Sequence, residues 1–286
     1  MKAKFVLAAA ACATLLAGAP ALADQHEHGK MDHSLHGPLH HGLMMAAQHE
    51  SRAEDKARDQ YRHPVETLAF FQVAPDMKVG ELAPGGGWYT RMLASYLSEK
   101  GELVGLYRHP SFATSDPERQ AQMRADAAAF PEKVSGWSGM SADRIKGFTT
   151  DALPEEELGT YDRIIVVRIF HHLFRTNSAL AEIKAMRSLL KDDGMIGIVQ
   201  HRAKMDAPYA YADGTKGYVR EADVIAMMEA NGFEFMGRSE INANPADSAD
   251  HPRGVWELPP VWGGKSEELK KVGESDRMTL LFKKRP

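Results

Sequence analysis

This sequence of 286 residues contains one cysteine, Cys12, and no large surplus of charge of either sign. Its 35 Lys and Arg against 39 Asp and Glu give no electrostatic reason to expect nucleic acid or an anionic membrane as a main partner. Cys12 lies in a segment that we expect to be cleaved off, which would leave no disulfide, no thiolate nucleophile and no Cys-ligated zinc. After residue 23 there is no apolar run long enough to span a membrane.

The first 23 residues have the layout of a secretory signal peptide. Lys2 and Lys4 precede an Ala-rich apolar stretch, and residues 21–23, Ala-Leu-Ala, have the small-x-small form that signal peptidase cleaves. Gly18 interrupts the stretch, and this disfavours a retained transmembrane anchor. We therefore expect cleavage after Ala23, a periplasmic or secreted protein, and no membrane association after cleavage.

Residues 24–50 are a polar leader that holds seven of the thirteen histidines. Imidazole binds borderline transition metals, so a flexible tract of this kind would bind Cu(II), Ni(II) or Zn(II) weakly. The histidines have no regular ligand spacing, which favours the plainer interpretation of a polar linker between signal peptide and domain. The histidines are His26, His28, His33, His36, His40, His41 and His49.

From about Ser51 to the end, short apolar segments alternate with amphipathic ones. The run Ile164–Val167 is typical of a strand that is buried on both faces. Seven strands with interleaved helices predict one α/β domain, residues 51–286, with a doubly wound sheet. Residues 111–144 contain Pro117 and Pro131 and indicate a helix with loops. The strands are expected at 77–82, 103–107, 145–149, 161–170, 195–200, 233–241 and 278–282.

A glycine-rich turn follows the first expected strand. The strand ends near Glu81, and Ala83, Gly85 and Gly87 then alternate, so that backbone can approach a ligand at the carboxyl edge of the sheet. The dinucleotide fingerprint needs a glycine where Thr90 stands, and no Gly-Lys-Ser/Thr follows to complete a P-loop. A nicotinamide site is therefore disfavoured.

Residues 79–90, Val-Gly-Glu-Leu-Ala-Pro-Gly-Gly-Gly-Trp-Tyr-Thr, resemble the first motif of class I S-adenosylmethionine-dependent methyltransferases. The order of the later elements is similar as well, at 150–154, 161–165, 190–195 and 276–284. More narrowly, residues 58–64, 84–90, 171–173 and 244–247 look like a group of exported bacterial proteins described as predicted methyltransferases. The resemblance covers residues 51–286 and implies a Rossmann-like seven-stranded sheet, mostly parallel with an antiparallel last strand.

The resemblance also implies a site for S-adenosylmethionine. Backbone at Ala83, Gly85, Gly86 and Gly87 would approach the methionine part of this cofactor. The carboxylate of Glu81 would hold its ammonium group, directly or through water. A tight turn without a ligand remains the alternative for the glycines, and a capping role remains the alternative for the carboxylate.

Two further positions would complete the cofactor site. Asp151 and Ala152 follow the third expected strand and would face the adenine amino group. After the second strand the family has an acidic residue for the ribose hydroxyls, but this sequence has Arg108. An arginine cannot accept those hydrogen bonds, although it suits a phosphate or a carboxylate, including the phosphorylated ribose of a nicotinamide.

Histidines at the carboxyl ends of strands are the candidate bases. Methyl transfer is an in-line displacement, so a base is needed only when the acceptor arrives protonated. His171 and His201 follow the fourth and fifth expected strands, where class I enzymes place residues that face the substrate. Packing or capping is the alternative for each. With His172 they would make a weak metal site, because spacing fixes no carboxylate beside them, and we expect no metal.

Two functions follow from these features. The first is an exported methyltransferase that acts on an unidentified small molecule or protein group. The alternative is a non-catalytic periplasmic protein that binds a ligand or a metal on the same fold, which Arg108 and the His-rich leader favour. Glu81, the glycine loop and Asp151 favour the enzyme. Residues 244–271 contain several prolines and glycines, and we expect either a lid over the site or a surface insertion there.

Overall fold

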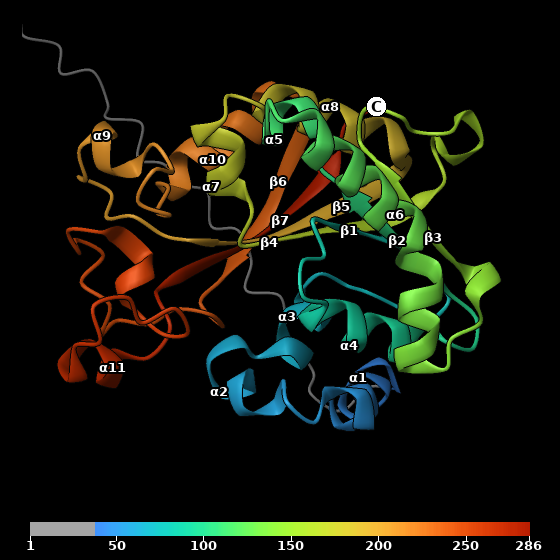
Figure 1. Cartoon of the computed structure of the whole chain (residues 1–286), viewed down its shortest axis with the longest axis horizontal. Coiled ribbons are helices and arrows are strands. Elements are labelled where there is room, and N and C mark those ends of the chain that lie inside the picture. Colours follow the sequence, from blue (N-terminus) through green and yellow to red (C-terminus); the bar gives the residue numbers. More distant parts are fainter. Residues whose placement is uncertain (1–37) are drawn as a thin grey trace, which may run out of the picture. The chain divides into compact units, whose positions relative to one another are not determined.

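The computed structural model describes residues 38–286, and the predicted signal peptide lies outside this range, as do the first four leader histidines. Its centre is a seven-stranded sheet with the strand order β3-β2-β1-β4-β5-β7-β6 (Figure 1). All neighbouring strands are parallel except β7, which is antiparallel to β5 and β6. The strands are β1 (Lys78–Leu82), β2 (Glu102–Tyr107), β3 (Ile145–Thr149), β4 (Tyr161–Val167), β5 (Leu190–His201), β6 (Phe233–Ser239) and β7 (Arg277–Lys284).

Helices cover both faces of the sheet, as expected for a doubly wound α/β fold. Helices α3, α4 and α6 pack on one face, and α7, α8 and α10 pack on the other. The predicted α/β class, with its antiparallel last strand, is confirmed. The helices are α1 (Pro38–Gln48), α2 (Asp59–Arg62), α3 (Pro64–Phe70), α4 (Trp88–Leu97), α5 (Pro110–Ala113), α6 (Pro117–Ser138), α7 (Phe170–Arg175), α8 (Ala179–Leu189), α9 (Tyr209–Ala212), α10 (Glu221–Ala230) and α11 (Glu267–Val272).

Strand β4 shows why these segments become central strands. Ile164, Ile165 and Val166 are fully buried. Ile165 packs into the core under α3 and α4, whereas its two neighbours pack into the core under α7 and α8. Side chains alternate between the faces of a strand, so a run without polar residues is stable only with helices on both sides.

The folded part of the chain begins earlier than the predicted boundary at residue 51. Residues of the expected leader form α1, where Leu43, Ala46 and Ala47 are buried against α3 and α4. The hydroxyl of Tyr96 donates to the carbonyl oxygen of Leu39 at 3.3 Å. This short amphipathic helix was not predicted, because the high histidine content of the segment indicated a linker. Its apolar residues nevertheless recur at helical spacing.

Residues 111–144 form one long helix, α6, with loops and short helical turns around it, which agrees with the expected helix and loops. Asp116 caps the start of α6 by accepting from the backbone N–H of Glu118 at 3.0 Å, and Pro117 is the first helical residue. Pro131 lies inside the helix, where proline normally causes a break. None of the helices in residues 38–286 is long and apolar enough to cross a membrane.

Gly197 lies in β5 at a point where the sheet and a helix are in close contact. A Cβ atom at this position would overlap the ring of Phe71, at the end of α3. We expect Gly197→Ala to lower the free energy of unfolding by about 1–3 kcal/mol, because the ring is fully buried and has nowhere to move. Urea unfolding measures the change. The control is Gly136→Ala in α6, where a Cβ meets no atom within 4 Å, and we expect it to be neutral or stabilising by up to about 1 kcal/mol. Equal effects of the two variants would contradict the packing described.

Candidate functional site

The glycine loop between β1 and α4 has a tightly constrained backbone. Ala83, Gly85 and Gly87 have φ values of 53°, 55° and 81°, which lie in the left-handed region. Glycine adopts this region freely, whereas the same conformation costs Ala83 about 1–2 kcal/mol in conformational free energy. The backbone N–H of Ala83 donates to the carbonyl oxygen of Leu106 at 2.7 Å, so β2 fixes the start of the loop.

The middle of this loop presents bare backbone to solvent. Gly85 and Gly86 are exposed, and a Cβ atom built on Gly86 would meet no atom within 4 Å. Gly87 differs, because a Cβ there would press on the ring of Trp137. The loop therefore offers an open surface, bounded by an aromatic ring, that a side chain at position 86 would fill.

Glu81 is buried directly beneath this loop. The hydroxyl of Thr90 donates to its Oε2 at 2.6 Å, and no ion pair to Glu81 is formed within residues 38–286. Arg91 is nearby, but its guanidinium binds both oxygens of Asp55, at 2.6 and 2.7 Å. Burial raises the pKa of Glu81 to about 8. A cationic group that reached this carboxylate would therefore stabilise its ionised form.

The other predicted cofactor residues are engaged by the protein itself. The guanidinium of Arg108 donates to Thr176 at 2.9 Å and lies 3.9 Å from the buried carboxylate of Glu182. Asp151 forms a bidentate ion pair with Arg124, at 2.6 and 3.0 Å, which lowers the pKa of Asp151. In the structure, therefore, the side chains of Arg108 and Asp151 stabilise contacts between elements of the fold.

Ala152 follows Asp151 in an exposed turn after β3. Its backbone N–H donates to the carbonyl oxygen of Thr149 at 3.0 Å, which closes the turn. The roles predicted for Arg108, Asp151 and Ala152 towards a cofactor stay predictions.

The two candidate bases lie next to each other. The ring centroids of His171 and His201 are 5.6 Å apart, and those of His171 and His172 are 4.2 Å apart. Nδ1 of His201 lies 2.5 Å from the hydroxyl of Ser275. Burial lowers the pKa of His171 to about 3 and that of His172 to about 4, and it lowers the pKa of His201 as well. All three rings are therefore neutral near pH 7.

Gln200 determines which nitrogen of His171 carries the proton. The amide nitrogen of Gln200 donates to the carbonyl oxygen of Gly217 at 2.8 Å, which fixes the orientation of the amide. Its Oε1 consequently faces His171 and lies 3.3 Å from Nδ1 of that ring. The proton is assigned to Nδ1, and Nε2 is left with a free lone pair.

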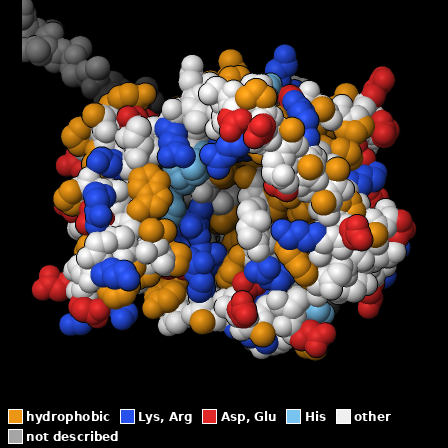
Figure 2. Space-filling view, in the orientation of Figure 1, with side chains coloured by type: hydrophobic (Ala, Val, Ile, Leu, Met, Phe, Trp, Pro, Cys, Tyr) orange, Lys and Arg blue, Asp and Glu red, His pale blue; other side chains and the backbone are white. Residues whose placement is uncertain are grey.

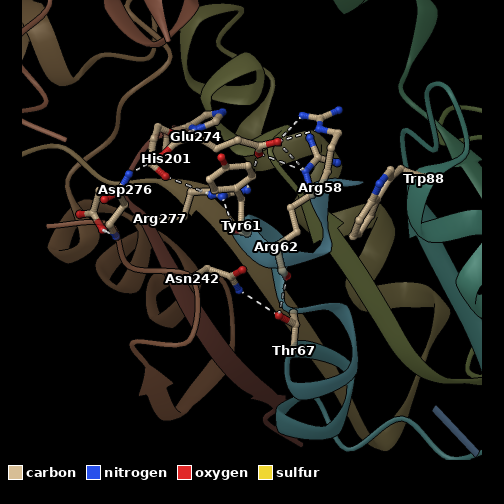
Figure 3. A network of polar contacts seen from close by, with 12 residues as sticks. Arg58, Tyr61, Arg62, Thr67, Trp88, His201, Asn242, Glu274, Asp276 and Arg277 are labelled. Atoms are coloured by element: carbon tan, nitrogen blue, oxygen red, sulfur yellow. Dashed lines mark hydrogen bonds and ion pairs between the residues drawn. The ribbon is translucent and has the colours of Figure 1, made fainter. Parts of the chain in front are cut away.

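Sequence reasoning missed an arginine cluster, which we define as Arg58, Arg62, Arg168 and Arg277. Three of its members surround the buried carboxylate of Glu274, at the start of β7 (Figure 3). The hydrogen bonds to this carboxylate measure 2.7 Å from Arg58, 3.1 Å from Arg62 and 3.1 Å from Arg277. Burial alone would raise the pKa of Glu274, but these cations hold it below its usual value.

Arg168, the fourth member, directly follows β4 and forms no ion pair within residues 38–286. Its Nε is buried without a hydrogen-bond partner among the described residues, and the same holds for Nη2 of Arg62. Burial and the neighbouring guanidinium groups lower the pKa of Arg168 to about 9 and that of Arg62 to about 10. Both arginines remain cationic at neutral pH.

A cavity of about 120 Å³ lies between Arg168 of the arginine cluster and the candidate bases. In Figure 2 a hollow on the face shown is lined with Lys or Arg and His side chains. One wall comes from residues 244–271, the segment for which we expected a lid or a surface insertion. The cavity is lined by Arg168, His171, His172, His201, Val255, Trp256, Pro259, Pro260, Val261, Glu274 and Ser275.

Local signals for these residues were present but weak. Arg168 ends an apolar strand, and Arg277 begins another, so each charge lies at the edge of a buried run. Arg58 and Arg62 are four residues apart on one face of a short helical segment. Spacing could not show that they converge, because Arg58 and Glu274 are 216 residues apart in sequence. Within residues 38–286, no group of three or more His, Cys, Asp or Glu is arranged to hold a metal ion.

The lowered pKa of His171 predicts a specific dependence of stability on pH. Between its ordinary pKa of 6.5 and its folded value of about 3, the unfolded state binds more protons than the folded state. As pH falls from 6.5 towards 4, this residue should therefore lower the free energy of unfolding by up to about 1.4 kcal/mol per pH unit. We expect His171→Asn to lose that contribution, so that its stability relative to the native protein improves as pH falls. Urea unfolding at pH 4 to 7 tests this, and a difference that is independent of pH would contradict it.

The sequence and the fold can be compared with those of known proteins. No family model matches the chain, and no curated protein matches its sequence. Among solved structures, the chain is similar to a SAM-dependent methyltransferase from Aquifex aeolicus, with a TM-score of 0.50 and 16% identity over 79% of this chain and 92% of that one. It is also similar to a protein from Galdieria sulphuraria, provisionally named a sarcosine dimethylglycine methyltransferase, with a TM-score of 0.51 and 13% identity over 81% and 86% of the two chains. The chain therefore has the Rossmann-like fold of class I methyltransferases.

Proposed function

We propose that this protein is an exported methyltransferase that uses S-adenosylmethionine. The observation that carries the proposal is the combination of an open glycine loop with the buried carboxylate of Glu81 beneath it. The cofactor carries an ammonium group on its methionine part, and this group would supply the positive charge that Glu81 lacks. The fold supports the same assignment, because its solved neighbours include a SAM-dependent methyltransferase. Export is supported by the sequence of residues 1–23.

The residues around the cavity fit the needs of a group transfer. When bound, the cofactor supplies an electrophilic methyl group on a sulfonium, so the protein has to align an acceptor and remove any proton that the acceptor loses. The free Nε2 lone pair of His171 is available to take that proton. Trp256, Pro259 and Pro260 wall the cavity and limit the access of water.

The non-catalytic alternative has one structural observation in its favour. Arg108 stands where the related family has a carboxylate, and its guanidinium is held by Thr176 and Ser178. The ribose contact usual for the family is therefore not available from this residue. Binding without turnover would support this second function.

We expect S-adenosylhomocysteine to bind the purified protein and Gly86→Val to abolish that binding. A valine at position 86 has room in the fold but would occupy the open surface of the loop, where the cofactor is expected. Isothermal titration calorimetry measures the affinity. Glu81→Gln should keep a hydrogen bond with Thr90 but lose the negative charge, and we expect it to weaken binding about tenfold or more.

Gly136→Val is the matched control, because position 136 is equally open but lies in α6. It should bind S-adenosylhomocysteine as the native protein does. Unaltered binding in Gly86→Val, or no binding by the native protein at millimolar ligand, would contradict the proposed function.

A further inference from the structure

The arginine cluster carries a second site, which neither the fold nor the glycine loop explains. We propose that it binds an oxyanion, a carboxylate or phosphate group carried by the small molecule that accepts the methyl group. The identification of this molecule as the acceptor rests on the proposed function. The binding of the oxyanion itself does not, and it can be measured without the cofactor.

The positive and negative charges in and around the cluster do not balance. Three guanidinium groups share one carboxylate, that of Glu274, and the fourth, that of Arg168, forms no ion pair within the described part of the chain. Three other carboxylates nearby form ion pairs with cations outside the cluster, and one of these cations, Arg202, also binds Glu221 and Glu240. The pairs are Asp55 with Arg91, Asp59 with Arg52, and Asp276 with Arg202. The cluster therefore keeps a surplus of positive charge at a partly buried position, which an anion would offset.

Two guanidinium groups of the cluster have hydrogen-bond donors that are not used. Nε of Arg168 and Nη2 of Arg62 are buried and have no partner among residues 38–286. Buried polar groups are normally paired, because an unsatisfied buried donor has lost its hydrogen bonds to water without gaining others. A guanidinium presents its N–H groups as a planar fork, which matches the oxygens of a carboxylate or a phosphate.

The cavity beside the cluster has a size and a lining that suit a small anion. Arg168 is the member of the cluster that lines it, together with the carboxylate of Glu274, whose charge the other three arginines offset. The cavity volume of about 120 Å³ is suited to one small charged group with little water. The three histidines beside it are neutral, so they add donors and acceptors without competing for the anion. Trp256 and Val261 provide apolar surface for the rest of a small molecule.

The position of the cluster connects it to the glycine loop. Val166 of β4 pairs with Leu82 of β1, so Arg168 and the loop lie at the same edge of the sheet. Trp88, the first residue after the loop, lies 4.7 Å from the guanidinium of Arg62 in a cation–π contact. An anion bound at the cluster would therefore hold its parent molecule beside the cofactor site.

The test measures binding of sodium phosphate and sodium malonate to the purified protein by calorimetry, at constant ionic strength and without cofactor. We expect saturable binding of at least one of the two, and the preference between them distinguishes a phosphate from a carboxylate ligand. Arg168→Gln should weaken binding about tenfold or more, because it removes one charged fork. Arg238→Gln removes the same charge from an exposed ion pair on β6 and should bind as the native protein does.

Thermal unfolding shows whether Arg168→Gln is folded. Because Arg168 is a half-buried cation among other cations, its replacement should leave the melting temperature unchanged or raise it. Failure of both anions to bind, or equal binding by Arg168→Gln, would overturn the inference. Binding of S-adenosylhomocysteine in the same preparations separates the two proposals. If S-adenosylhomocysteine binds and neither anion does, the proposed function is supported and the anion site is wrong. If an anion binds and S-adenosylhomocysteine does not, the anion site is supported and the proposed function is wrong.

Discussion

The carboxylate of Glu274 is the contact on which the candidate site depends. It joins Arg58 and Arg62, near the start of the described chain, to Arg277 at the start of the last strand. Removing one partner from such a buried group costs about 3–5 kcal/mol, because the remaining charges lose their compensation. The ion pairs thus fix the N-terminal helices against β7. They also leave Arg168, which has no carboxylate of its own, facing the cavity.

Acidic and basic side chains lie at separate places along one edge of the sheet, and this arrangement fits a reaction with two substrates. A buried acidic side chain, Glu81, lies under the glycine loop, and the positive arginine cluster lies beyond β4. Neutral histidines lie beside the cluster. Arg168 is one of the causes of the low pKa of His171, so an anion bound at Arg168 would make His171 a stronger base. Binding of the acceptor and removal of its proton would then be coupled through one side chain.

The sequence predicted those parts of the fold that depend on local patterns. Buried strands such as β4 are continuous apolar runs, and the glycine loop is defined by consecutive residues, so both could be recognised without tertiary information. Helix α1 was missed because its histidines outweighed the spacing of Leu43 and its neighbours. The helix expected within residues 111–144 is α6, although Pro131 lies inside it. The arginine cluster could not be predicted, since its members meet only after the sheet has brought distant segments together.

The central claim is that the cofactor and the anion occupy two separate, adjacent sites, and one titration tests it most directly. S-adenosylhomocysteine is titrated into the purified protein with and without saturating sodium phosphate or malonate, whichever binds. The account predicts that both ligands bind to the same molecule, with an affinity for S-adenosylhomocysteine that is unchanged or higher when the anion is present. Displacement of S-adenosylhomocysteine by the anion would show one shared site and would contradict the account.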